Sequence, residues 1–77
     1  MAAATALQSI SALDQIGEAA GVIWQHLNQN GPTSLTKLVR DLGLHRDVVM
    51  QALGWLARED KLSIDDEGRT RMIRLRD

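Results

Sequence analysis

Apolar positions in the first half of the chain recur at the spacing of an amphipathic helix. From Ile16 to Leu27 they return every three or four residues, and Asp14 is of a residue type that caps helix N-termini. An Asn-Gly-Pro sequence at positions 30–32 then favours a helix end. We therefore predict a helix that begins at Asp14, with Leu13 packed against its first turn. Its expected core residues are Ile16, Ala20, Ile23, Leu27 and, beside them, Trp24.

Two further helical patterns follow, separated by Gly43 and Leu44. Residues 33–35 predict a short strand, after which Ser34 or Thr36 caps a helix of about two turns. The next helix is expected from Arg46 to about residue 58 or 59. Steps of 100° separate its apolar face from its polar face. The apolar face holds Val49, Ala52, Leu53 and Leu56, and the polar face holds Asp47, Gln51, Gly54 and Arg58.

The end of the chain changes from a helical to an alternating pattern. Residues 61–65 alternate polar and apolar side chains, residues 66–68 have the composition of a turn, and residues 69–76 form the predicted return strand. Two short helices joined at a glycine and followed by a hairpin are typical of a winged helix-turn-helix. We expect an α+β fold with three helices, a small antiparallel sheet and a C-terminal β-hairpin wing.

Two segments carry a resemblance to a known family. Residues 16–28 (IGEAAGVIWQHLN) and residues 52–61 (ALGWLAREDK) resemble small prokaryotic winged helix-turn-helix domains of unassigned function. The resemblance covers about residues 14–76. It implies the winged fold and a DNA-binding or regulatory role, and it brings neither a catalytic residue nor a cofactor.

Length and composition limit the chain to one small domain. With 77 residues, a net charge of −1 and no cysteine, it has neither disulfides nor thiolate metal sites. We expect a flexible leader at residues 1–12 and the winged domain at residues 13–77. The chain begins without the pattern of a signal peptide and has no apolar run long enough to span a membrane, so a cytoplasmic location is expected.

Candidate DNA contacts lie on the third helix and on the arginine-rich return strand. Arginine suits guanine or phosphate, and glutamine suits adenine. Against this interpretation, Asp47 repels phosphate, and charged residues on an edge strand also protect it from aggregation. The candidates are Arg46, Met50, Gln51, Arg58, Arg69, Arg71, Arg74 and Arg76.

A second hypothesis is a protein-interaction or oligomerisation module that keeps the winged fold without reading DNA. Its candidate interface is Val48, Gly54 and Trp55, since an apolar flank and a helical glycine both suit a partner. Single-stranded nucleic acid is a weaker alternative, because stacking on bases requires exposed aromatic side chains. The chain shows no catalytic or metal-ligand arrangement, so we expect a binding module rather than an enzyme, with no cofactor.

Overall fold

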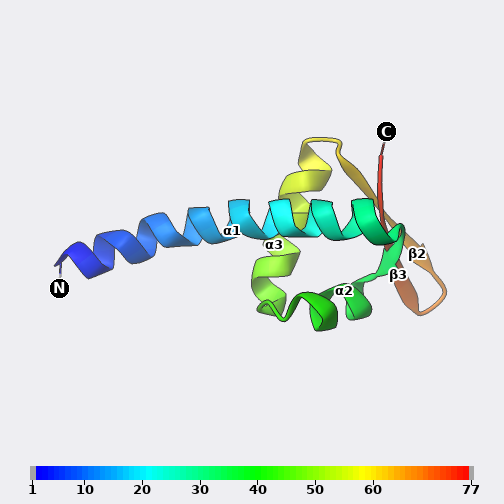
Figure 1. Ribbon diagram of the computed structural model, residues 1–77, viewed down its shortest axis with the longest axis horizontal. Helices are drawn as coiled ribbons and strands as arrows, with labels where there is room; N and C mark the ends of the chain where they lie inside the picture. The colour runs from blue at the N-terminus through cyan, green and yellow to red at the C-terminus, as the bar shows by residue number, and fades with distance from the viewer. Residues whose placement is uncertain (1, 77) are drawn as a thin grey trace.

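The computed structural model describes the backbone of residues 2–76 and the side chains of residues 12–76. The elements are α1 (Ala2–Asn30), β1 (Thr33–Ser34), α2 (Leu35–Leu42), α3 (Arg46–Arg58), β2 (Leu62–Glu67) and β3 (Thr70–Leu75). α1 lies across α3, and the β2–β3 hairpin projects from the end of the molecule opposite the N-terminus (Figure 1). The predicted fold class, three helices with a small antiparallel sheet and a C-terminal wing, is confirmed.

α1 begins earlier than the sequence pattern predicted. The helix runs without interruption from Ala2 through Asp14, so Asp14 is an interior residue and its predicted role as N-cap is wrong. Leu13 is 65% exposed and does not pack against a first turn. The physical reason is that the alanine-rich segment before Asp14 favours helix and contains no residue that stops one. The flexible leader stays a prediction, since the side chains of residues 1–11 lie outside the described part.

The helix-turn-helix forms where the sequence predicted it. The Ser34 hydroxyl caps α2 by accepting a hydrogen bond from the backbone N–H of Lys37 at 3.2 Å. α2 ends at Gly43, whose left-handed φ of 64° allows the chain to turn, and whose N–H donates to the carbonyl of Val39. α3 then starts at Arg46, directly after His45. The angle between the two helices is therefore set by a residue that carries no side chain.

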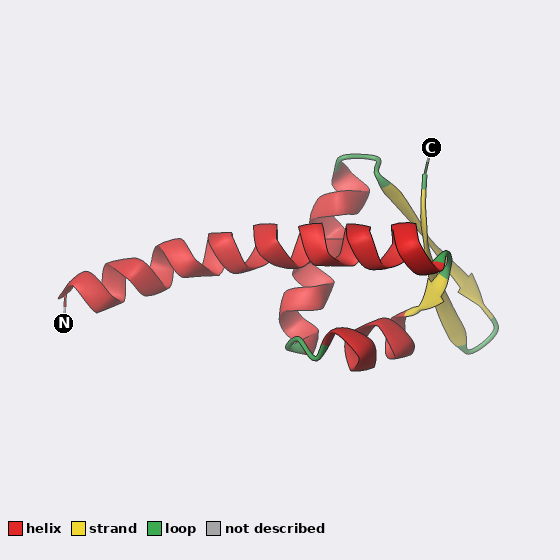
Figure 2. Ribbon diagram, viewed as in Figure 1, coloured by secondary structure: helices red, strands yellow, loops and turns green. Residues whose placement is uncertain are grey.

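The sheet has three antiparallel strands in the order β1-β3-β2. β3 is the central strand, because Thr33 and Ser34 of β1 pair with Ile73 and Met72 on its free side. The interpretation of the arginine-rich strand as an exposed edge is thus wrong where β1 covers it. The turn between β2 and β3 lies near the start of α2 (Figure 2).

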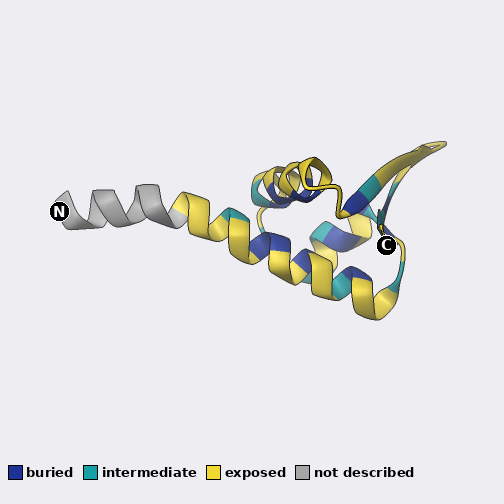
Figure 3. Cartoon of the chain, turned by 90° about the horizontal axis from the view of Figure 1, so that it is seen from above, coloured by how far each residue is buried: buried dark blue, intermediate teal, exposed yellow. Residues whose placement is uncertain are grey.

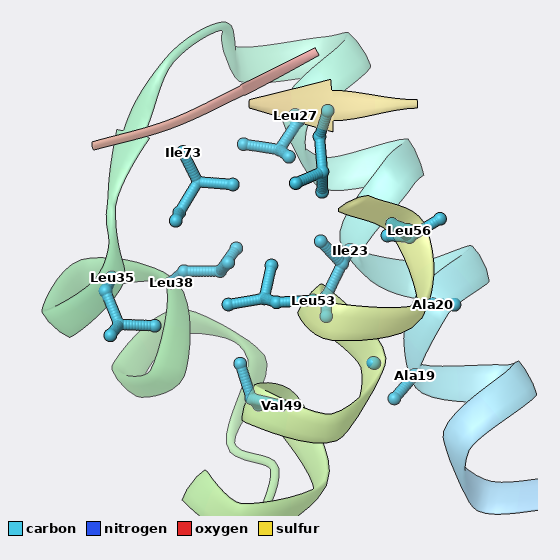
Figure 4. Packing of buried hydrophobic residues seen from close by; sticks show 12 residues of the cluster. Ala19, Ala20, Ile23, Leu27, Leu35, Leu38, Val49, Leu53, Leu56 and Ile73 are labelled. Carbon is cyan, nitrogen blue, oxygen red and sulfur yellow. The ribbon is translucent and has the colours of Figure 1, made fainter. Parts of the chain in front are cut away.

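One apolar core joins the three helices to the sheet. Its buried residues are Ala19, Ala20, Ile23, Leu27, Leu35, Leu38, Val49, Ala52, Leu53, Leu56, Leu62 and Ile73. Within it, Ile23, Leu38 and Leu53 from the three helices point toward Ile73 of β3 (Figure 4). The buried positions form a band on the inner sides of the helices (Figure 3). The buried face predicted for α3 is confirmed.

Trp24 is the clearest error in the predicted core. It is 41% exposed and lies outside the buried cluster. It follows Ile23, which is fully buried, and one step along a helix turns a side chain by about 100° away from the core. None of the helices in the described residues is long and apolar enough to span a membrane.

Candidate nucleic-acid interface

The outer side of α3 carries the residues predicted to read DNA. Arg46, Met50 and Gln51 are all exposed, as the opposite face fills the core. Asp47 lies in the first turn of α3, where the helix dipole favours a negative charge. Among residues 12–76 no ion pair joins Asp47 to Arg46. Asp47 therefore has a helix-stabilising position without neutralising its neighbour.

A polar cleft brings the start of α3 together with the wing tip. The cleft has a volume of about 460 Å³ and is lined by Leu35, Thr36, Arg46, Asp66, Gly68, Arg69, Thr70 and Arg71. Arg46 of α3 thus lines the same surface as Arg69 and Arg71 of the wing, which are distant from it in sequence. Gly68 has a φ of 65° in the hairpin turn, which brings Arg69 to the tip. We refer to this surface as the wing cleft.

Three of the four wing arginines already have carboxylate partners. Nε of Arg71 lies 3.0 Å from Oδ1 of Asp66. Arg74 lies between two acids, with Nε 3.0 Å from Oδ2 of Asp65 and Nη2 3.0 Å from Oε1 of Glu67. Arg76 pairs with Asp60. The positive charge of the wing is therefore largely balanced by its own hairpin and the loop before it.

These acidic partners were missed in the sequence analysis, although the sequence contained a signal for them. An acidic end of one hairpin strand is followed by a basic strand, and antiparallel pairing places the two side by side. In the register found, Asp66 is directly opposite Arg71, while Ser63 is opposite Arg74. Arg74 consequently reaches diagonally across the hairpin to Asp65 and Glu67. The position of the turn in the sequence did not by itself predict these pairs.

Of the other candidate arginines, the fold keeps Arg46 and Arg69 together and separates Arg58 from them. Within residues 12–76, neither Arg46 nor Arg69 takes part in an ion pair. Arg58 ends α3, about 18 Å along the helix axis from Arg46, and does not line the wing cleft. The cleft therefore offers two arginines that have no internal counter-ion.

The fold agrees with a family match. A family model described as a winged helix-turn-helix domain (DUF2582) matches residues 12–75. The chain belongs to the DUF2582 family. The resemblance inferred from residues 16–28 and 52–61 is thereby confirmed.

Two other proteins are similar to this chain, one by sequence and one by structure. An uncharacterised protein of Methanocaldococcus jannaschii, MJ1608, is 40% identical over 65 residues, which cover 80% of this chain and 91% of that protein. A solved chain from HOP2 superposes with a TM-score of 0.67 at 30% identity, covering 75% of this chain and 98% of that chain. HOP2 is described as having DNA recognition and protein interaction domains and homologous DNA pairing properties.

A second surface of the DUF2582 domain is a groove between α1 and the end of α3. It has a volume of about 700 Å³, and both tryptophans line it, Trp24 at 41% and Trp55 at 46% exposure. Gly17 and Gly21 form part of its α1 side, and a Cβ added to either would meet no atom within 4 Å. Nε1 of Trp55 donates a hydrogen bond to Oε1 of Glu59 at 2.7 Å. We refer to this surface as the tryptophan groove.

The three predicted partner residues do not form one patch. Val48 is half-buried against the core and lines a separate apolar hollow with Val22 and Leu44, whereas Trp55 lines the tryptophan groove. The expected joint patch of Val48 and Trp55 is wrong, because α1 crosses α3 between them. Gly54 is exposed, and a Cβ there would also meet no atom within 4 Å. A contact within the domain therefore does not explain the glycine.

One polar cluster ties α1 to the helix-turn-helix. Oδ2 of Asp41 in α2 accepts a hydrogen bond from Nζ of Lys37 at 2.8 Å and lies 3.5 Å from Nε2 of His26 in α1. The Lys37 hydrogen bond is the main reason that the pKa of Asp41 is lowered, and partial desolvation opposes it. Among the described residues, no group of three or more potential ligands is arranged to hold a metal ion.

Proposed function

We propose that this domain binds double-stranded DNA through the wing cleft, as a binding module rather than an enzyme. One observation carries the proposal: the fold brings Arg46 and Arg69 to one polar cleft, and within residues 12–76 neither has a counter-ion. Unpaired arginines at a helix start and a hairpin tip suit the phosphates on either side of a groove. The DNA recognition described for HOP2 supports the same class of partner.

The arrangement favours duplex over single-stranded DNA. An exposed helix end next to a wing can enter a major groove while the wing contacts the neighbouring backbone. Met50 and Gln51 lie about one turn further along the exposed side of α3, where they would face base edges if this helix end enters the groove. Single strands need aromatic stacking, and both tryptophans line the tryptophan groove instead of the wing cleft.

The direct experiment titrates a fluorescent duplex with the full chain at about 50 and 200 mM salt. Two phosphate contacts predict a slope of log affinity against log salt of about −1.8. Arg46→Ala and Arg69→Ala should each make the slope less steep by about 0.9. Arg58→Ala is the matched control, because it removes the same charge from α3 outside the cleft. Absence of binding at about 50 mM salt, or equal losses in all three variants, would overturn the proposal.

A role in transcription regulation is a finer part of this proposal, and it requires a preferred sequence. Competition between a selected duplex and random duplexes measures that preference. Discrimination by α3 should fall in Gln51→Ala, because a bidentate contact with adenine carries sequence information that a phosphate contact does not. Equal competition by all duplexes would leave a DNA-binding domain without a regulator's specificity.

The tryptophan groove favours a second candidate function, self-association. Its proposed occupant is α1 of a second copy. The charges that line the groove are balanced, because Lys61 lies near Glu59 and Arg76 pairs with Asp60, so the groove suits an uncharged helix face. Gly17 and Gly21 allow another helix to approach closely. A two-fold pair would also present two wing clefts to one duplex, which is the usual arrangement for helix-turn-helix proteins.

Sedimentation equilibrium of the full chain tests self-association directly. Trp55→Ala and Gly21→Leu should both shift the population toward monomer, the first by removing contact area and the second by blocking the approach. Val22→Ala is the control, because Val22 lines the apolar hollow on the other side of α1. A wild-type chain that is monomeric at every accessible concentration rules this candidate out.

A further inference from the structure

We propose that Asp65, Asp66 and Glu67 occupy the places of DNA phosphates and restrain the wing from binding duplexes indiscriminately. This inference rests on the DNA-binding function proposed above. It assigns the acids of β2 a role in specificity: they compete with phosphate for the arginines of β3. A duplex then gains the wing contacts only when α3 also docks, which holds the phosphate close enough to displace a carboxylate.

The geometry of the hairpin carries the first step. Three ion-pair contacts of 3.0 Å join β3 to β2, one at Arg71 and two at Arg74. Carboxylate and phosphate oxygens present the same acceptor chemistry to a guanidinium group. The arginines are therefore already held at the contact distance that a phosphate complex needs.

Exposure determines which arginine is released first. Arg71 has one partner, Asp66, whose side chain is 73% exposed, and both residues line the wing cleft. Solvent-exposed pairs of this kind are weak and are further weakened by salt. Arg74 is 39% exposed and has two carboxylates around it. We therefore expect a phosphate to compete more easily for Arg71 than for Arg74, which keeps two acids, although in the wild type Asp66 still holds Arg71.

The consequence is a measurable change in salt dependence. In the wild-type domain only Arg46 and Arg69 count fully as phosphate contacts, which gives the slope of about −1.8. Each further arginine released from its acid should steepen the slope by about 0.9. By the same relation, it should raise affinity for a random duplex about fifteenfold at 50 mM salt and about fourfold at 200 mM. Because phosphate contacts ignore sequence and a preferred duplex already displaces the acids when α3 docks, the gain should be larger for random than for preferred duplexes, and discrimination between them should fall.

The test measures duplex affinity and salt slope for two isosteric changes. Asp66→Asn is expected to release Arg71, and Asp65→Asn with Glu67→Gln is expected to release Arg74. The matched control for the double variant is Asp14→Asn with Glu18→Gln, which changes the net charge of the full chain by the same two units on α1, and Asp14→Asn alone matches the one unit of Asp66→Asn. Circular dichroism and thermal unfolding establish that every variant is folded. A gain in the control equal to that in the wing variants would overturn the inference, because net charge alone would then explain it.

A double-mutant cycle separates competition from simple repulsion. Adding Arg74→Gln to the Asp65→Asn, Glu67→Gln variant should cancel its gain if the acids act through that arginine. A gain that survives the loss of Arg74 overturns the inference, since the acids would then only repel DNA. If neither the wild type nor any wing variant binds at about 50 mM salt, the proposed DNA function fails as well. If the wild type binds and the wing variants match it, only the inference fails.

Discussion

The wing cleft and the tryptophan groove differ in how far the domain satisfies its own side chains. In the wing, most of the positive charge is balanced by acids from the same hairpin and its preceding loop. In the groove, two tryptophans remain more than 40% exposed beside two open glycines. The number of arginines therefore overstates the electrostatic attraction of the wing for DNA. The net charge of the chain does not indicate that the tryptophan groove exists. The side chains that a surface leaves without a partner indicate what it binds better than its residue composition does.

Leu53→Ala should have the largest effect, because both surfaces rest on the same core. Leu53 is 1% exposed and points toward Ile73 between the three helices. Replacing a buried leucine with alanine lowers the free energy of unfolding by about 2–5 kcal/mol, a large share of the stability of a domain this small. Urea unfolding followed by circular dichroism measures the change. A loss below about 1 kcal/mol would mean that the core closes around the deletion, and that the two surfaces are supported separately.

Gly43→Ala should affect the wing cleft more than the tryptophan groove. Gly43 has a φ of 64° between α2 and α3, and an L-residue in that conformation costs about 1–2 kcal/mol. The strain acts at the turn that places Arg46, while α1 and the end of α3 are remote from it. Urea unfolding should show this loss, and DNA affinity should fall while self-association is retained. Gly31→Ala, also at positive φ but outside the helix-turn-helix, is the control.

The helix-turn-helix was predicted from sequence because its signals are local. Ser34, Gly43 and the spacing of Val49, Leu53 and Leu56 each act within a few residues, and each was found as expected. The start of α1 was not predicted, because Asp14 is a favoured cap residue but is also tolerated at a small cost on the exposed side of a helix interior. A local signal of that kind cannot distinguish the two when the preceding residues also favour helix.

The candidate site depended more on long-range contacts and was predicted less completely. That Arg46 meets Arg69 is a consequence of the fold as a whole. The pairing of Arg74 with two acids follows from strand register, which the sequence did not specify, and the two exposed tryptophans reflect how α1 crosses α3. Residue types thus predicted which chemistry is present, whereas tertiary structure determined which groups remain free to use it.

Gly54→Ala tests whether either surface extends over the outer side of α3. Alanine is favoured over glycine in a helix interior by about 1 kcal/mol, and the added Cβ would meet no atom within 4 Å. The free energy of unfolding should therefore rise by up to that amount. If DNA or a second copy approaches α3 closely at this point, binding should weaken although stability rises. A rise in stability with both forms of binding intact would place Gly54 outside both interfaces.

The smallest expected effect concerns the Asp41 cluster. It connects α1, which lines the tryptophan groove, to α2, whose first residues line the wing cleft. The hydrogen bond from Lys37 lowers the pKa of Asp41 in the folded domain, and the nearby His26 and Arg40 add to this lowering. A carboxyl whose pKa is lower in the folded than in the unfolded state stabilises the fold above its unfolded pKa. That stabilisation is lost as the pH falls through the folded value. Asp41→Asn should therefore flatten the fall in unfolding free energy between about pH 5 and pH 3.

Lys37→Met should flatten the same part of the pH profile, because it removes the main cause of the lowered pKa while keeping the carboxyl group. Asp14→Asn is the control, since within residues 12–76 Asp14 takes part in no ion pair. Urea unfolding at several pH values gives all four profiles. If the Asp41→Asn profile runs parallel to that of the wild type, the cluster does not connect α1 to α2 electrostatically. The two surfaces would then be joined through the apolar core alone.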